Sequence, residues 1–118
     1  MNKVREVIAY KQYFEEFLNK QTTKVQDKIF KIIEAIETLE RVPSNNLKHL
    51  TGTDGLYEAR VQLGSNIWRV FCFFDGDQLV ILLNGFQKKT QKTPKKEIER
   101  AELLMTEYYQ DKANEHGN

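Results

Sequence analysis

The strongest constraint on the fold is a change of hydrophobic period near the middle of the chain. Apolar residues between positions 24 and 42 recur at three- and four-residue steps, which is the spacing of one face of an α-helix. Between positions 56 and 86 the apolar residues alternate instead, in runs separated by short segments that contain glycine. This change predicts a domain that packs helices against an antiparallel sheet.

The alternating part of the chain predicts three strands, over residues 56–63, 67–74 and 79–86. Gly64-Ser65-Asn66 and Asp75-Gly76-Asp77 are typical of the tight turns of a β-meander.

The rest of the chain predicts helices and one further strand. Residues 4–10 are expected to form a short strand, and residues 11–18 and 24–42 an antiparallel helical hairpin in which Thr22 or Thr23 caps the second helix. Pro43 should end that helix, and residues 43–55 should form a loop. Thr93 and Pro94 are expected to begin a last helix, and the tail from Asp111 is expected to fray.

These elements predict an α+β fold in one domain over residues 1–118: an N-terminal strand and a helical hairpin packed on a three-stranded antiparallel meander, with a C-terminal helix. The single cysteine, Cys72, excludes an internal disulfide. No apolar run has the length of a membrane span, and the first residues lack the core of a signal peptide. We therefore expect a cytoplasmic protein that does not engage membranes.

Charge is distributed unevenly although the net charge is only +1. One basic block in residues 84–100 holds Lys88, Lys89, Lys92, Lys95, Lys96 and Arg100 against Glu97 and Glu99. A nearly neutral chain with one such block favours a localised anion site over a surface that coats nucleic acid.

The alternation of the meander places two arginines together. If the first turn has two residues, Gly64-Ser65 or Ser65-Asn66, Arg60 and Arg69 share a face of the sheet. We expect the polar face to show Glu58, Arg60, Gln62, Arg69, Phe71, Leu82, Asn84, Phe86 and Lys88. The other face, expected beneath the helical hairpin, comprises Tyr57, Ala59, Val61, Trp68, Val70, Cys72, Ile81 and Leu83.

Neighbouring arginines repel each other, and a bound anion would remove that cost. An alternative is that Glu58 neutralises one of them in an ordinary surface ion pair. Phe71 and Phe86 either stack on a nucleic-acid base or pack under the last helix. Lys92, Lys95 and Lys96 either meet a polyanion or form only a solvated segment.

Three motifs in order carry a family resemblance: Leu56-Tyr57-Glu58-Ala59-Arg60-Val61, Trp68-Arg69-Val70, and Gly85-Phe86-Gln87-Lys88-Lys89-Thr90-Gln91-Lys92-Thr93-Pro94 before a helix. Together they resemble the RelE/HigB superfamily, in particular the phage-derived HigB-like branch of type II toxin–antitoxin toxins. Ala59 departs from the pattern, which usually has a larger apolar residue there.

The resemblance implies a RelE/ParE-like fold and a ribosome-dependent mRNA endoribonuclease that needs no cofactor. It implies three partners: a cognate helix-turn-helix antitoxin, mRNA and the ribosomal A site. It also implies that Arg60, Arg69, Lys88 and Lys89 are the basic positions that line the RNA site.

Metal-free RNA cleavage by the substrate's 2′-hydroxyl needs a base, positive charge at phosphorus and an acid. Arg60 and Arg69 suit the charge, Lys88 or Lys89 could be base or acid, and Glu58 is a second candidate base. The candidates for RNA binding are Lys92, Lys95, Lys96, Asn84 and Phe86.

Other chemistries have less support in the sequence. His49 and His116 lie in a predicted loop and in the tail, and Asp75 and Asp77 flank a turn glycine, so neither a histidine pair nor a metal site is predicted. Two alternative functions stay open, namely a ParE-like inhibitor of DNA gyrase and a non-catalytic interaction domain.

Overall fold

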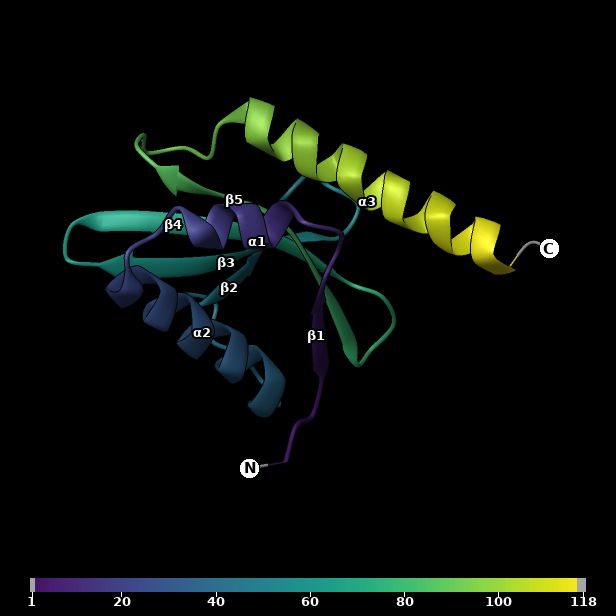
Figure 1. The fold of residues 1–118 in the computed structure, drawn as a ribbon, viewed down its shortest axis with the longest axis horizontal. Helices are drawn as coiled ribbons and strands as arrows, with labels where there is room; N and C mark the ends of the chain where they lie inside the picture. Colours follow the sequence, from purple (N-terminus) through teal and green to yellow (C-terminus); the bar gives the residue numbers. More distant parts are fainter. Residues whose placement is uncertain (1, 117–118) are drawn as a thin grey trace.

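The sheet has five strands in the order β1-β5-β4-β3-β2. The computed structural model describes residues 2–116 and shows α1 and α2 on one side of this sheet and α3 on the other (Figure 1). The elements are β1 Glu6–Ala9, α1 Tyr13–Asn19, α2 Thr23–Thr38, β2 Leu47–His49, β3 Leu56–Leu63, β4 Asn66–Phe74, β5 Leu79–Lys88 and α3 Lys95–His116. Within residues 2–116, no helix is long and apolar enough to cross a lipid bilayer.

The α+β class and the order of the predicted elements are confirmed, but the sheet is wider than predicted. β1 pairs in parallel with β5, and β2, which lies within the predicted loop 43–55, pairs antiparallel with β3. Three residues without clear alternation carry no strand signal of their own, so only their pairing with β3 makes β2 a strand.

Both long helices end at different places from those predicted. α2 begins after the predicted cap Thr22, whose side chain accepts a hydrogen bond from Val25 N, but it ends at Thr38 rather than near Pro43. The guanidinium of Arg5 donates to the carbonyls of Ile36, Leu39 and Glu40, so a distant side chain satisfies the end of this helix.

The prediction of a frayed tail from Asp111 is wrong, because α3 continues to His116. Tyr10 donates its hydroxyl proton to Asp111, and Lys112 Nζ lies 2.7 Å from Asp75 Oδ2. These tertiary contacts hold the last turns of the helix. Residues 117–118 and the side chain of His116 lie outside the described part.

The first meander turn has one of the two predicted registers. Leu63 pairs with Asn66 across Gly64-Ser65, and Gly64 has a φ of 63°, which suits the first position of a type II′ turn. Arg60 is therefore directly opposite Arg69, and the two share a face as predicted.

The second turn is longer than predicted, and this changes the faces of β5. Phe74 pairs with Val80, and a β-bulge then shifts the register between Val70 and Cys72. Leu82 consequently packs on the α1–α2 side, while Ile81 and Leu83 pack on the α3 side, opposite to the prediction for all three. Past the bulge, Phe86 pairs with Arg69 and so shares its face, as expected.

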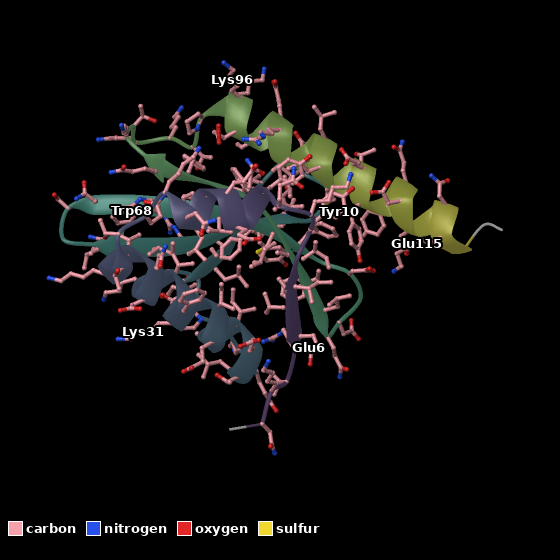
Figure 2. All side chains as sticks on the ribbon, in the orientation of Figure 1. Glu6, Tyr10, Lys31, Trp68, Lys96 and Glu115 are labelled. Carbon is pink, nitrogen blue, oxygen red and sulfur yellow. The ribbon has the colours of Figure 1, made fainter. Side chains whose placement is uncertain are left out.

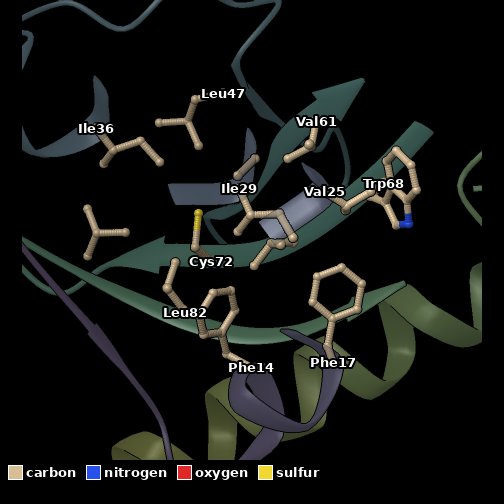
Figure 3. Packing of buried hydrophobic residues seen from close by; sticks show 13 residues of the cluster. Phe14, Phe17, Val25, Ile29, Ile36, Leu47, Val61, Trp68, Cys72 and Leu82 are labelled. Carbon is tan, nitrogen blue, oxygen red and sulfur yellow. The ribbon is translucent and has the colours of Figure 1, made fainter. Parts of the chain in front are cut away.

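Two apolar cores hold the layers together. One joins α1 and α2 to the sheet, and Figure 3 shows Phe14 and Phe17 facing Cys72, Ile29 and their neighbours. The second core packs α3 on the other face through residues that include Phe71, Phe73, Ala101, Leu104 and Met105. Cys72 is fully buried, as its predicted core position requires.

Candidate functional site

Two arginines and one glutamate form a partly buried cluster at the middle of β3 and β4. Glu58 Oε1 lies 3.5 Å from Arg69 Nε and 3.9 Å from Arg60 Nε, so both guanidinium groups share one carboxylate. Arg69 and Glu58 are each only 4% exposed, whereas the side chain of Arg60 is 29% exposed. The cluster therefore keeps an excess of positive charge at its accessible end.

The segment before α3 covers Glu58. Thr93 Oγ1 donates a hydrogen bond of 3.0 Å to Glu58 Oε2, the oxygen that does not face the arginines most closely. Both carboxylate oxygens thus have partners within the protein. This placement favours a role as counter-ion for Glu58 over that of a general base, because a base needs a free oxygen at the substrate.

A groove of about 810 Å³ runs beside this cluster. Four of the sequence candidates, Arg60, Arg69, Lys88 and Lys89, line it together with residues of the β3–β4 turn and of the loop after β5. A second cavity of about 410 Å³ shares Arg60, Ile67 and Arg69 with the groove and extends to Lys28 of α2. The four basic candidates are thus brought to one open surface.

The electrostatics of the groove distinguish Lys88 from its neighbours. Burial lowers the pKa of the Lys88 ammonium, and repulsion from Arg69, Arg60 and Lys48 lowers it further, while Glu58 raises it. Burial and the nearby Arg60 also lower the pKa of Arg69. An arginine remains cationic under such a shift, whereas a lysine with a lowered pKa becomes a better proton donor.

Two lysines near the groove are not among the site residues predicted from the sequence. Lys48 of β2 pairs in register with Glu58, and Lys28 of α2 lines the adjoining cavity. Recognition of Lys48 required the pairing of β2 with β3, and recognition of Lys28 required the packing of α2 against the sheet. No local signal in the sequence points to either residue.

Most of the predicted RNA-binding residues lie elsewhere. Lys92, Lys95 and Lys96 are exposed and are not part of the groove lining, and Figure 2 shows Lys96 pointing away from the sheet at the start of α3. Phe86 stacks on Phe71, with ring centroids 5.5 Å apart, and packs with the α3 core, which is the alternative to base stacking considered above.

Asn84, another predicted RNA-binding residue, does not line the groove. Asn84 is buried beside the bulge of β5 and lines a separate cavity next to α1. The β-bulge places Leu83 and Asn84 together opposite one residue of β4, between the pairs of Leu82 and Gly85.

The structure gives no support to a histidine-based or a metal-based site among residues 2–116. His49 lies on β2 rather than in a loop, and its ring meets Tyr57 edge-on at 5.2 Å. Asp75 accepts hydrogen bonds from Tyr108 and Lys112, so it serves the attachment of α3. Among residues 2–116 no group of three or more His, Cys, Asp or Glu side chains is arranged to hold a metal ion.

Comparisons with known proteins place the chain in a family context. The family described as "Phage derived protein Gp49-like (DUF891)" matches residues 16–106. The crystal structure of an archaeal RelE-RelB complex from Pyrococcus horikoshii contains a chain of similar fold, with a TM-score of 0.51 and 19% identity. That match covers 73% of this chain and 97% of the other. No protein of curated function matches the sequence.

Proposed function

We propose, because the chain belongs to the phage-derived Gp49-like family of RelE/HigB-type toxins, that it is the toxin of a type II toxin–antitoxin system and cleaves mRNA. The observation that carries this proposal is the register pair Arg60–Arg69, which lies with Lys88 and Lys89 around one groove. Adjacent guanidinium groups with a single shared carboxylate favour a phosphodiester as the missing anion.

In the proposed reaction the 2′-oxygen of the RNA forms a bond to the neighbouring phosphorus while the bond from phosphorus to the 5′-oxygen breaks. The proton of the 2′-hydroxyl passes to solvent, and the departing 5′-oxygen receives a proton from the Lys88 ammonium, which solvent later restores. The products are a 2′,3′-cyclic phosphate and a 5′-hydroxyl. Arg60 stabilises the charge on the phosphorane oxygens from the open side.

Arg69 has a different position from Arg60 in this proposal. Its guanidinium is almost fully buried and also donates from Nη1 to the carbonyl of Trp68 at 3.1 Å. It supplies fixed positive charge beneath the phosphate, while Lys89 is exposed at the rim of the groove and binds the RNA backbone.

Two partners follow from the same proposal. The RelE-RelB complex supports an antitoxin as the partner that inhibits this chain. An open groove without a candidate general base fits a substrate that the ribosome has already oriented, which supports cleavage of mRNA in the A site.

The test is cleavage of a defined mRNA by the purified protein, with and without ribosomes, followed by mapping of the new 5′ ends. We expect discrete ends only with ribosomes, and a loss of roughly 100-fold or more in rate for Arg60→Ala, because one donor to the transition-state oxygens is removed. Arg41→Ala is the matched control, since Arg41 is exposed and does not line the groove.

The two alternative functions, a gyrase inhibitor and a non-catalytic interaction domain, predict different results. Inhibition of DNA supercoiling by gyrase without any RNA cleavage would support the ParE-like function instead. Growth that continues normally on expression of the wild-type protein, together with unchanged mRNA, would leave a non-catalytic interaction domain.

A further inference from the structure

A separate cavity of about 290 Å³ lies where α1, β5 and the first turns of α3 meet. Its walls include three aromatic rings and three side-chain amides, from Tyr13, Phe17 and Phe86 and from Gln21, Asn84 and Gln87. Four charged side chains, Glu16, Lys20, Glu97 and Arg100, complete the lining. Gln87 also lines the basic groove, so the two depressions adjoin along β5. Nothing in the proposed cleavage step uses this cavity.

The bulge of β5 gives Asn84 an unusual orientation. Val70 pairs with Gly85 but Cys72 pairs with Leu82, so Leu83 and Asn84 together face one residue of β4. Leu83 packs in the α3 core, and Gly85 faces Phe17 so closely that a Cβ there would lie 2.6 Å from the Phe17 ring. Asn84 is thus outside the alternation of the strand, as is common where a bulge redirects a side chain.

The free edge of β5 begins beside the bulge. β1 pairs with β5 only as far as Leu82, whose carbonyl accepts a hydrogen bond from Tyr10 N, and the chain then turns away into α1. Within residues 2–116, β5 therefore has no neighbouring strand on this side beyond Leu82. Asn84 lies at the end of the paired section, next to the cavity.

The amide of Asn84 is buried but has no partner. The residue is 2% exposed, and neither Oδ1 nor Nδ2 forms a hydrogen bond within the described part of the protein. Burying an unpaired donor and acceptor is costly, so such a group in a folded protein calls for a partner that is bound at another stage.

We propose that the cavity receives one nucleobase of the RNA that lies in the groove, and that Asn84 reads the edge of that base. An amide offers one donor and one acceptor side by side, which matches the paired acceptor and donor on the edge of a base. Aromatic walls suit an unstacked base of single-stranded RNA. This proposal rests on the proposed function and adds a specificity site to it.

The size and position of the cavity agree with this ligand. Its volume is at the lower end of small-molecule sites, which suits one base rather than a whole nucleotide chain. The Asn84 amide is covered in the structure, so entry of the base requires side chains of the cavity lining to move.

The experiment measures binding of short single-stranded RNA in which the nucleotide at the cleavage site carries a 2′-deoxy group, so that attack is impossible. Fluorescence anisotropy is recorded for a series in which one nucleotide at a time lacks its base. For the wild-type protein we expect affinity to fall about 10-fold when the base is missing at one particular position. For Asn84→Leu we expect the same 10-fold loss with intact RNA and no further loss with that abasic RNA.

Asn19→Leu is the matched control, because Asn19 is exposed at the end of α1 and should retain the wild-type profile. If Asn84→Leu does not fold, Gln87→Ala serves as a second variant, because Gln87 is exposed. We expect Gln87→Ala to weaken binding of the intact RNA more than binding of the abasic RNA. The Asn84 side-chain NH₂ resonances should also shift on addition of the intact RNA.

A wild-type abasic profile in Asn84→Leu, accompanied by a higher melting temperature, would overturn the proposal, because the amide would then be only a buried polar group. The readout is binding and needs neither cleavage nor ribosomes. A protein that binds in this way but never cleaves would contradict the proposed nuclease function and leave the base site standing.

Discussion

Thr93 donates a hydrogen bond of 3.0 Å to Glu58, a residue 35 positions earlier in the chain. This contact ties the segment before α3 to the centre of the sheet. The same glutamate faces both arginines of the groove, so the loop that carries Lys89 and the cationic floor of the groove are joined through one carboxylate.

Replacement of Thr93 by valine should loosen this connection. Loss of one hydrogen bond to a buried carboxylate should lower the free energy of unfolding by about 1 kcal/mol and reduce the rate of RNA cleavage, because the loop after β5 is no longer held in place. Urea unfolding and the ribosome assay measure the two effects. Thr106→Val, on an exposed turn of α3, is the matched control. Equal cleavage by both variants would contradict the coupling.

Replacement of Glu58 by glutamine should strengthen anion binding while it weakens the fold. Arg69 loses its buried counter-ion, so the free energy of unfolding should fall by about 3 kcal/mol in a buffer without multivalent anions. Added phosphate should restore more stability to this variant than to the wild type, because it binds only the folded state. Thermal unfolding across a phosphate series measures this, with exposed Glu34→Gln as the control.

The same variant separates two roles for Glu58. A counter-ion can be replaced with retention of cleavage and tighter RNA binding. Complete loss of cleavage together with unchanged RNA affinity would instead identify Glu58 as the general base.

Lys88 should determine the alkaline limit of cleavage. Burial and the neighbouring cations lower its pKa, so the ammonium loses its proton at a pH below that of an ordinary lysine. As an acid it is active only when protonated, and the rate should therefore fall as pH rises through this lowered pKa. In Lys88→Arg cleavage should be slow at every pH, because a guanidinium keeps its proton and cannot protonate the departing 5′-oxygen. A pH–rate profile that is the same in both proteins would exclude this role.

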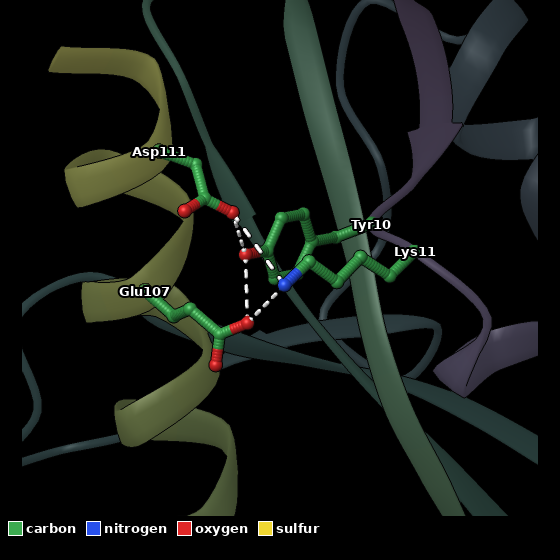
Figure 4. A network of polar contacts seen from close by, with 4 residues as sticks. All are labelled: Tyr10, Lys11, Glu107 and Asp111. Carbon is green, nitrogen blue, oxygen red and sulfur yellow. Dashed lines mark hydrogen bonds and ion pairs between the residues drawn. The ribbon is translucent and has the colours of Figure 1, made fainter. Parts of the chain in front are cut away.

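Acid should detach α3 before it affects the rest of the fold. Hydrogen bonds from Lys112 and Tyr108 hold the pKa of Asp75 below its usual value, and bonds from Lys11 and Tyr10 lower the pKa of Glu107 (Figure 4 shows the Tyr10 network). Because these carboxyl groups bind protons more weakly when folded, their stabilisation is complete above the unfolded pKa of about 4 and is lost as pH falls through the folded values.

Asp75→Asn tests this assignment. The variant should melt at a lower temperature than the wild type at pH 7, and the difference should shrink towards pH 3, where the wild-type carboxylate is also protonated. Asp77→Asn, an exposed neighbour in the same turn, serves as the control. A difference in melting temperature that stays constant over this range would show that Asp75 does not titrate in the native contact.

The sequence by itself determined the α+β class, the helix after Thr22 and the shared face of Arg60 and Arg69. Each depends on local rules: hydrophobic period, a side-chain cap, and a turn whose length Gly64 specifies. The face of Arg60 then fixes the face of Arg69, because side chains alternate strictly on paired strands without a bulge.

Only the tertiary structure decided the strand β2, the full length of α3, the faces of residues 81–83 and the environment of Glu58. β2 exists through pairing with β3, and the last turns of α3 are held by contacts with Tyr10 and Asp75. The length of the second turn reverses the faces of residues 81–83, and the bulge of β5 restores the expected face of Phe86; the local sequence reveals neither. These features depend on contacts between residues far apart in the chain, and no local period or propensity encodes such contacts.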